Sequence, residues 1–190
     1  AFDLARQLEK KNLLNIIITT YPKYFVANYN IPKKKVRSFL IKELIYRLFI
    51  KLKLYKIAER LLFYLNHLFE NFAAKSIDYK NINLIIGWSG CSEKTFLKCK
   101  KTNGNILKVL ERGSTHIKFQ NQILLEEYKR FGIKSIPVNQ RIIDKELREY
   151  DAADYIMVPS QFAKNSFLKN NINNKKILKV PYGVDLSIFK

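Results

Sequence analysis

The sequence predicts an α/β fold, a Rossmann-like parallel sheet flanked by helices, and three observations support this prediction. Short, continuous apolar runs of strand length alternate along the chain with longer amphipathic stretches of helix length. From residue 83 onward, each apolar run ends abruptly in a polar loop. Alternation of this kind is typical of βαβ units, whose parallel strands are buried between helices.

The composition is that of a folded, strongly basic chain. Hydrophobic residues make up 47% of the 190 residues, which excludes a mainly disordered protein and suits one domain with one core. The net charge of +19 attracts polyanions in general, whether nucleic acid, anionic lipid surfaces or phosphorylated substrates. A solvated surface that is basic because the whole composition is rich in Lys, Asn and Ile is an equally good explanation.

Cysteine and histidine usage argues against a disulfide scaffold and against a metal site. The chain has two cysteines, Cys91 and Cys99, which are too few for a fold that disulfides hold together, and their spacing matches no zinc motif. Together with the lack of a secretory segment at the start, they predict a reducing, cytoplasmic compartment. His67 and His116 are the only histidines, so no metal-ligand cluster is expected.

The first third of the chain opens with a predicted helix. Residues 1–11 have amphipathic helix spacing from the first residue onward, and 13–20 form a β-branched run that Pro22 ends. Residues 30–36 contain a proline and a run of lysines and could form at most a short edge strand. A chain that begins inside a helix, with no strand before it, is expected to lack the first strand of its fold.

Residues 39–72 are predicted to be helical because they are rich in Leu, Ile, Phe and Tyr and contain no Gly or Pro. Their apolar residues form two stripes on different sides, which predicts a break near Lys53. Charged residues interrupt the stretch too often for a membrane-spanning helix. Packing against a sheet is the preferred interpretation, and a helix that lies on an anionic membrane surface is the alternative.

The remainder predicts a regular series of strands and helices. Strands are expected at 83–86, 106–110, 155–158 and 177–180, and helices at 93–100, 120–130, 143–151 and 161–168. Ser92 and Ser160 are placed to cap the helices that follow them. Because the carboxyl ends of parallel strands meet at one edge of a sheet, the loops after these four strands should lie together, and ligands of open α/β sheets bind there.

The most polar of these loops is Glu111–His116, read Glu-Arg-Gly-Ser-Thr-His. Its side chains could bind hydroxyls, phosphate or a charged headgroup. Alternatively, Glu111 and Arg112 pair with neighbouring chain and Ser114 caps a turn. The sequence has no Walker A loop and no Gly-x-Gly-x-x-Gly, and without a Gly-x-Ser-x-Gly elbow a Ser–His–Asp triad is disfavoured.

Three segments carry a resemblance to a known family. Residues 146–162, followed by 180–185 and Phe189, resemble the end of the N-terminal domain of GT4-family glycosyltransferases, which have the GT-B fold. The upstream segment 111–116, with Gln122 and Glu126–Tyr128, is similar to bacterial members that build polysaccharides or lipid-linked glycans. The resemblance covers most of the chain, is clearest from residue 83 onward and is weak over 21–80.

The resemblance implies half of a two-domain enzyme. In that family two Rossmann-like domains face a cleft, the N-terminal one holding the acceptor and the C-terminal one holding the nucleotide sugar. Residues 1–190 would be the acceptor-side domain, without its first strand and without the second domain, and would not transfer sugar alone. The implied reaction is retaining transfer from a UDP- or GDP-sugar to a glycan or lipid-linked acceptor. It needs no cofactor or obligatory metal and would take place in the cytoplasm, at the cytoplasmic membrane face if the acceptor is lipid-linked.

The resemblance and the loop pattern together define a predicted site. Glu111 and His116 are the candidate catalytic residues, on the acceptor wall of the cleft. The candidate substrate-binding residues come from all four loops, with the last two near the hinge between domains: Trp88, Ser89, Gly90, Arg112, Gly113, Ser114, Ser160, Gly183 and Asp185.

Two other functions stay open. A basic nucleic-acid-binding α/β domain would explain the charge, but it would not explain four aligned loops, and no nucleic-acid motif is present, so no specific nucleic-acid partner is expected. A GT-B sugar-nucleotide epimerase or phosphorylase would keep the architecture and change the reaction.

Overall fold

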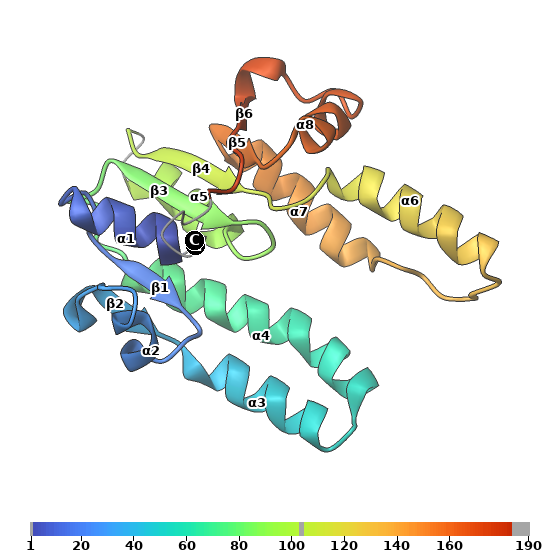
Figure 1. Cartoon of the computed structure of the whole chain (residues 1–190), viewed down its shortest axis with the longest axis horizontal. Helices are drawn as coiled ribbons and strands as arrows, with labels where there is room; N and C mark the ends of the chain where they lie inside the picture. Colours follow the sequence, from blue (N-terminus) through green and yellow to red (C-terminus); the bar gives the residue numbers. More distant parts are fainter. Residues whose placement is uncertain (1, 103–104, 184–190) are drawn as a thin grey trace, which may run out of the picture. The chain divides into compact units, whose positions relative to one another are not determined.

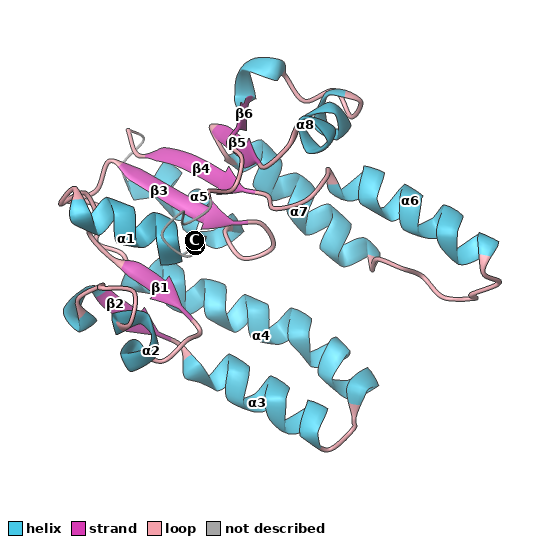
Figure 2. Cartoon of the chain, viewed as in Figure 1, coloured by secondary structure: helices cyan, strands magenta, loops and turns pink. Residues whose placement is uncertain are grey.

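The chain is an α/β protein with parallel sheets flanked by helices, which confirms the predicted fold class (Figures 1 and 2). The structure is a computed structural model and describes residues 2–102 and 105–183. These residues divide into two compact units. The first comprises 2–82 and 98–102, and the second comprises 83–97 and 105–183.

The first unit begins with helix α1 (Phe2–Lys10), as the amphipathic spacing predicts. A short parallel pair follows, formed by β1 (Ile17–Thr19) and β2 (Val36–Ser38), with the unpredicted helix α2 (Lys23–Ala27) and the 3-10 turn η1 (Lys33–Lys35) between them. Strand β1 is shorter than the β-branched run that predicted it. The core of this part consists of small and branched side chains: Ala5, Leu14, Val26, Ile31 and Val36.

Two long helices complete the first unit and lie side by side as a hairpin (Figure 1). They are α3 (Leu40–Lys51) and α4 (Tyr55–Ser76), and Lys53 between them has a φ of 58°, in the left-handed region. The predicted break near Lys53 is therefore confirmed. At the other end of the hairpin, the ring of Phe39 packs against Phe72, with ring centroids 5.1 Å apart. Among the described residues, no helix is both long and apolar enough to cross a membrane.

The second unit is built on the strands β3 (Leu84–Trp88), β4 (Leu107–Glu111), β5 (Tyr155–Val158) and β6 (Ile177–Lys179). In the described part of the chain they form one sheet in that order, here called the main sheet, and every neighbouring pair is parallel (Figure 2). The connections carry α5 (Glu93–Thr102), α6 (Ile117–Arg130), α7 (Gln140–Ala152), α8 (Gln161–Leu168) and the 3-10 turn η2 (Asn174–Lys176).

Most of these elements match their predictions, and the largest differences lie at two helix starts. Strands β3 and β4 end later than predicted, so that Gly87, Trp88 and Glu111, expected in loops, belong to strands. Strand β5 and helix α8 have the predicted bounds, and the hydroxyl of Ser160 accepts the N–H of Ala163 at 3.1 Å, as a cap should. Helices α6 and α7 begin earlier than predicted, because His116 and Asn139 act as their caps. The earlier start of α6 turns most of the predicted polar loop into a tight link between β4 and a helix.

The core of the second unit fixes the main sheet between its helices. Leu110 and Ile156 from the central strands are fully buried, and large rings from α5, α7 and α8 cover them: Phe96, Tyr150 and Phe167. Burying one side chain of this size contributes about 2–3 kcal/mol. The two central strands, β4 and β5, are the most deeply buried, and the loops at the carboxyl edge follow directly from them.

Candidate functional site

The carboxyl ends of the main-sheet strands lie in register, as predicted. Trp88 at the end of β3 pairs with Glu111 at the end of β4, and Glu111 in turn pairs with Met157 of β5. Backbone bonding continues just beyond the strands, since Ser89 N–H donates to Glu111 O at 3.0 Å and Arg112 N–H donates to Met157 O at 2.9 Å. The loops that contain the predicted site residues therefore start side by side.

Arg112 is committed to an internal network. Its guanidinium donates to the carboxylate of Glu146 at 3.3 Å, to Gln120 Oε1 at 2.6 Å and to the carbonyl of Thr115 at 3.1 Å. The side chains of Arg112 and Glu146 are only 12% and 7% exposed. This geometry corresponds to the alternative in which Arg112 holds its own loop and does not bind a ligand.

Glu146 gathers further donors from the same edge. Its carboxylate accepts the hydroxyl of Ser89 at 2.9 Å and the hydroxyl of Tyr150 at 2.8 Å. Burial raises the pKa of Tyr150 well above its usual range, so the phenol stays protonated and keeps donating. Ser89 and Arg112 are thus tied to the same carboxylate of α7, which fixes the loop after β3 to the loop after β4.

His116 lies under the site and not in it. Its ring is 1% exposed and packs against Tyr150 and Phe167, with ring centroids 5.0 and 5.1 Å apart. The ring Nδ1 accepts the N–H of Lys118 at 3.3 Å, and the backbone N–H of His116 donates to Ser166 Oγ at 2.8 Å. Burial lowers the pKa of His116 to about 4, so the ring is neutral at pH 7. The ring of this predicted catalytic residue is therefore enclosed by side chains of the protein itself.

An internal carboxylate occupies the N-terminus of α5. Glu149 of α7 is fully buried, and its oxygens accept the N–H of Ser92 at 2.7 Å, the N–H of Glu93 at 3.2 Å and the N–H of Gly90. A helix N-terminus directly after a parallel strand is where α/β proteins commonly bind a phosphate. Here Glu149 takes that place, and so the predicted site residue Gly90 uses its N–H inside the protein.

One accessible part of the edge contains Trp88, Glu111, Gly113 and Tyr182, and is called the open edge below. Trp88 is 49% exposed and Tyr182 is 63% exposed. A methyl group on the Cα of Gly113 would lie 2.6 Å from the Tyr182 hydroxyl oxygen and 3.6 Å from Cζ2 of Trp88, so both rings approach this glycine closely. Burial raises the pKa of Glu111 above its usual value.

The other predicted residues fall outside this group. Ser114, Ser160 and Gly183 are exposed on the loops after β4, β5 and β6, and Asp185 lies outside the described residues. Tyr182, which the sequence prediction did not name, belongs to the open edge and stands in the predicted loop after β6. Glu146 and Glu149 were also missed. Helical spacing could have indicated them. Ile143, Glu146 and Tyr150 recur on one side of α7, and Glu149 lies beside them, so both glutamates are near the apolar face of the helix.

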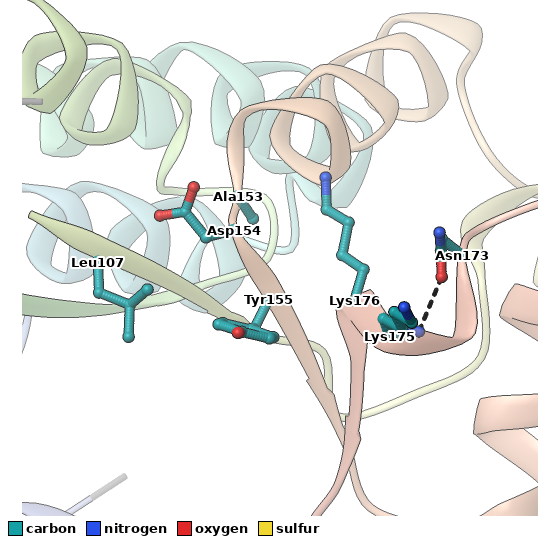
Figure 3. A pocket seen from close by; sticks show the side chains of 7 residues that line it. All are labelled: Leu107, Ala153, Asp154, Tyr155, Asn173, Lys175 and Lys176. Carbon is teal, nitrogen blue, oxygen red and sulfur yellow. Dashed lines mark hydrogen bonds between the residues drawn. The ribbon is translucent and has the colours of Figure 1, made fainter. Parts of the chain in front are cut away.

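A hollow in the second unit lies at the opposite edge of the main sheet (Figure 3). It is lined by residues at the amino ends of β4 and β5 and around η2: Leu107, Ala153, Asp154, Tyr155, Asn173, Lys175 and Lys176. The carboxylate of Asp154 in this hollow is already paired, since it binds the ammonium of Lys108 at 2.7 Å. Burial would raise the pKa of this carboxyl, but the hydrogen bonds and the charge of Lys108 outweigh burial, so the pKa is lowered. None of the predicted site residues lines this hollow.

Comparisons with known proteins and a search for metal-binding groups returned no matches. In the described part of the chain, no three His, Cys, Asp or Glu side chains converge so that they could hold a metal ion. No protein-family model, curated protein or solved structure matches the chain.

Proposed function

We propose that this chain is the acceptor-side domain of a retaining glycosyltransferase that moves a sugar from a UDP- or GDP-sugar to a glycan or lipid-linked acceptor. The observation that best supports this proposal is the open edge, where two exposed aromatic rings approach Gly113 and the partly desolvated carboxyl of Glu111 stands two residues before it in the chain. The parallel α/β fold and the resemblance of the loop sequences are consistent with it.

The open edge has the chemistry that a sugar requires. A sugar ring presents hydroxyls at its rim and an apolar face of C–H groups, so it suits a site that combines aromatic surface with a few polar groups. Trp88 and Tyr182 would contact the apolar face. Glu111 would accept a hydrogen bond from an acceptor hydroxyl, and its raised pKa makes it a better proton acceptor as transfer proceeds.

The donor is proposed to bind on another domain. A nucleotide sugar carries phosphates, and the N-terminus of α5 already holds the carboxylate of Glu149. Retaining transfer of this type is proposed to need no cofactor. For location, we propose the cytoplasm, with peripheral attachment at the inner membrane face where lipid-linked acceptors would be found.

Acceptor binding can be measured directly because Trp88 is the only tryptophan of the chain. Its fluorescence should change saturably when oligosaccharides or lipid-linked glycans are titrated, whereas UDP and GDP should cause little change. Glu111→Gln and Tyr182→Ala should weaken glycan binding about ten-fold or more, the cost of about one lost hydrogen bond or ring contact. Tyr24→Ala, which removes an equally exposed ring from the first unit, should leave it unchanged. Saturable binding of nucleotides but not of glycans would contradict the proposal.

Turnover gives a second test, in a polypeptide that also carries a nucleotide-sugar-binding domain. Glu111→Gln should lower kcat about 10²-fold, the usual contribution of a group that accepts a proton, while donor affinity stays unchanged. Normal turnover of this variant would exclude Glu111 as a catalytic residue. Products of phosphorolysis or epimerisation in place of a glycosylated acceptor would favour the alternative GT-B reactions.

A further inference from the structure

The turn between α3 and α4 presents an unusual surface. Residues 51–57, called the hairpin tip below, read Lys-Leu-Lys-Leu-Tyr-Lys-Ile, and every one of them is exposed. The apolar side chains are 40–56% exposed, from Leu54 to Leu52. A single exposed leucine is ordinary, but four large apolar side chains gathered at one turn indicate a surface that something covers.

The apolar surface continues from the hairpin tip along α3. Leu44, Leu48 and Leu52 follow one another at four-residue spacing, so they lie on one side of the helix, and all three are more than half exposed. At about 1.5 Å per residue, this stripe extends the surface by roughly 12 Å. The hairpin therefore exposes a connected apolar face that extends beyond the turn itself.

The charges on and beside this face are mostly basic, and one of the cations, Arg47, pairs with Glu43 at 3.4 Å. Between Glu43 and Glu59 the chain has no acidic residue, while Arg47, Lys51, Lys53 and Lys56 are basic. All four of these cations are exposed. Long basic side chains beside apolar ones can extend their charged ends to the water-facing layer while their stems stay in contact with lipid.

An anionic lipid bilayer matches both properties of the tip. Its headgroup layer presents a continuous array of phosphates, and the acyl boundary lies only a few ångströms below. A nucleic acid would satisfy the cations but would leave the leucines and the isoleucine uncovered. The combination of exposed apolar side chains with the three lysines of a tip that contains no acidic residue therefore favours lipid.

We propose that the hairpin tip docks on an anionic bilayer, with Leu52, Leu54, Tyr55 and Ile57 in the boundary between headgroups and acyl chains. Lys51, Lys53 and Lys56 bind the lipid phosphates. This contact belongs to the first unit and does not depend on sugar transfer at the open edge. Loss of glycan binding and loss of lipid binding are thus separate results.

The contribution of charge is tested by sedimentation of the 190-residue chain with vesicles of phosphatidylcholine containing one third phosphatidylglycerol. Each lysine near an anionic surface strengthens partitioning about five-fold. Combining Lys51→Gln, Lys53→Gln and Lys56→Gln should therefore weaken binding roughly 100-fold at low salt. The matched control, Lys75→Gln with Lys100→Gln and Lys101→Gln, removes the same charge from exposed lysines outside the tip and should weaken binding much less.

The contribution of insertion is tested with a matched pair of double variants at high salt, where charge attraction is screened. Leu52→Ser with Tyr55→Ser should weaken vesicle binding about ten-fold or more, since two apolar side chains no longer leave water. Leu13→Ser with Tyr24→Ser removes a leucine and a tyrosine that are 68% and 69% exposed elsewhere in the first unit, and it should have little effect. Far-UV circular dichroism of each variant checks that it is folded.

A fluorescent reporter tests the proposal without removing any contact. In a Trp88→Phe background, Tyr55→Trp places the only tryptophan in the tip, and its emission should shift to the blue on anionic vesicles and be quenched by brominated lipid. Absence of both changes would overturn the proposal. So would equal binding to pure phosphatidylcholine vesicles, or equal weakening by the tip and control variants.

Discussion

At the scale of single residues, the surroundings of His116 make the stability of the protein depend on pH. The pKa of this ring is about 4, below its ordinary value of 6.5, because burial disfavours the charged form. As the pH falls from 6.5 toward 4, the unfolded chain takes up a proton that the folded chain does not bind. The free energy of unfolding should therefore decrease by about 3 kcal/mol between pH 7 and pH 4 because of this ring alone.

Urea unfolding of the wild type and of His116→Asn over this pH range checks this value. Asparagine can still cap α6 but does not titrate, so the variant should be less stable at pH 7 and should lose less stability on acidification. The raised pKa of Glu111 acts with the opposite sign, stabilising the fold as the pH falls, and cancels in the comparison. If the free energy of unfolding changed equally with pH in both proteins, the pKa of His116 would not be lowered in the folded state.

Gly87 and Gly113 provide a matched pair of glycine-to-alanine exchanges. A Cβ at Gly87 would lie 2.3 Å from Ser92 Oγ and 3.0 Å from the ring of Phe96, which are packed at the start of α5. A Cβ at Gly113 would meet the far end of the exposed Tyr182 side chain, which can move away. We expect Gly87→Ala to lower the free energy of unfolding by about 1–3 kcal/mol and Gly113→Ala to change it by less than about 0.5 kcal/mol.

Denaturant unfolding of both glycine variants measures the difference. Gly113→Ala should still weaken glycan binding, because it displaces a ring of the open edge. If Gly113→Ala destabilised the protein as much as Gly87→Ala, the Tyr182 side chain could not move away from a Cβ at residue 113, contrary to its exposure.

Residue types and loop positions could be predicted from the sequence, but the roles of the residues could not. Trp88, Glu111 and Gly113 lie at the predicted edge because strand ends align in any parallel sheet. For Arg112, ligand binding and internal pairing were both open, and its partner Glu146 stands 34 residues away, so only the folded chain shows the pair. Local pattern carries no information on such a pairing. The catalytic and binding roles proposed for these residues remain predictions.

At the scale of elements, Glu149 joins α7 to the start of α5. Its buried carboxylate satisfies N–H groups that the helix itself leaves unpaired. Glu149→Gln removes the charge and turns an amide NH₂ toward these donors, so we expect the free energy of unfolding to fall by about 2–3 kcal/mol. Thermal or urea unfolding measures this loss. Glu126→Gln, at an exposed position on α6, is the control and should cost less than about 0.5 kcal/mol.

The elements themselves were predictable to the extent that their signals are local. The break at Lys53 and the bounds of β5 and α8 follow from apolar stripes and from Ser160. The starts of α6 and α7 lie earlier than their apolar repeats predict, because the caps His116 and Asn139 precede the first apolar repeat. Histidine is an uncommon cap, and its capping here depends on the burial of its ring.

For the whole molecule, alternation of strands and helices was enough to predict the fold class and the parallel main sheet. The division into two compact units was not foreseen, because apolar residues are spread evenly over the chain and mark no boundary. The pair β1–β2 illustrates the reason. The sequences of its short strands do not differ in kind from those of the main sheet, and only the hydrogen-bonded pairing shows that they form a sheet of their own.

The net charge of +19 leads to a prediction for the whole molecule. Repulsion among 35 basic residues opposes compaction, and only 16 acidic residues offset it. Exposed pairs such as Arg130–Glu127 and Arg47–Glu43 contribute at most about 0.5 kcal/mol each. Screening of repulsion should therefore outweigh screening of attraction when salt is added, and Tm should rise. If the gain is about 1–2 kcal/mol, the rise between 10 and 150 mM sodium chloride is roughly 2–8 °C, as the Debye length shortens from about 30 to 8 Å.

Differential scanning calorimetry across a sodium chloride series separates screening from other effects of salt. A gain from screening should level off once the Debye length is shorter than the spacing of surface charges, near 0.3 M by the same scale. A gain that continued in proportion to salt up to 1 M would instead reflect exclusion of salt from the surface. A fall in Tm would mean that attraction between opposite charges outweighs repulsion among the basic residues. Because the hairpin tip carries three lysines and no acidic residue, the combined Gln variant at Lys51, Lys53 and Lys56 should start from a higher Tm at low salt and gain less from added salt than the wild type.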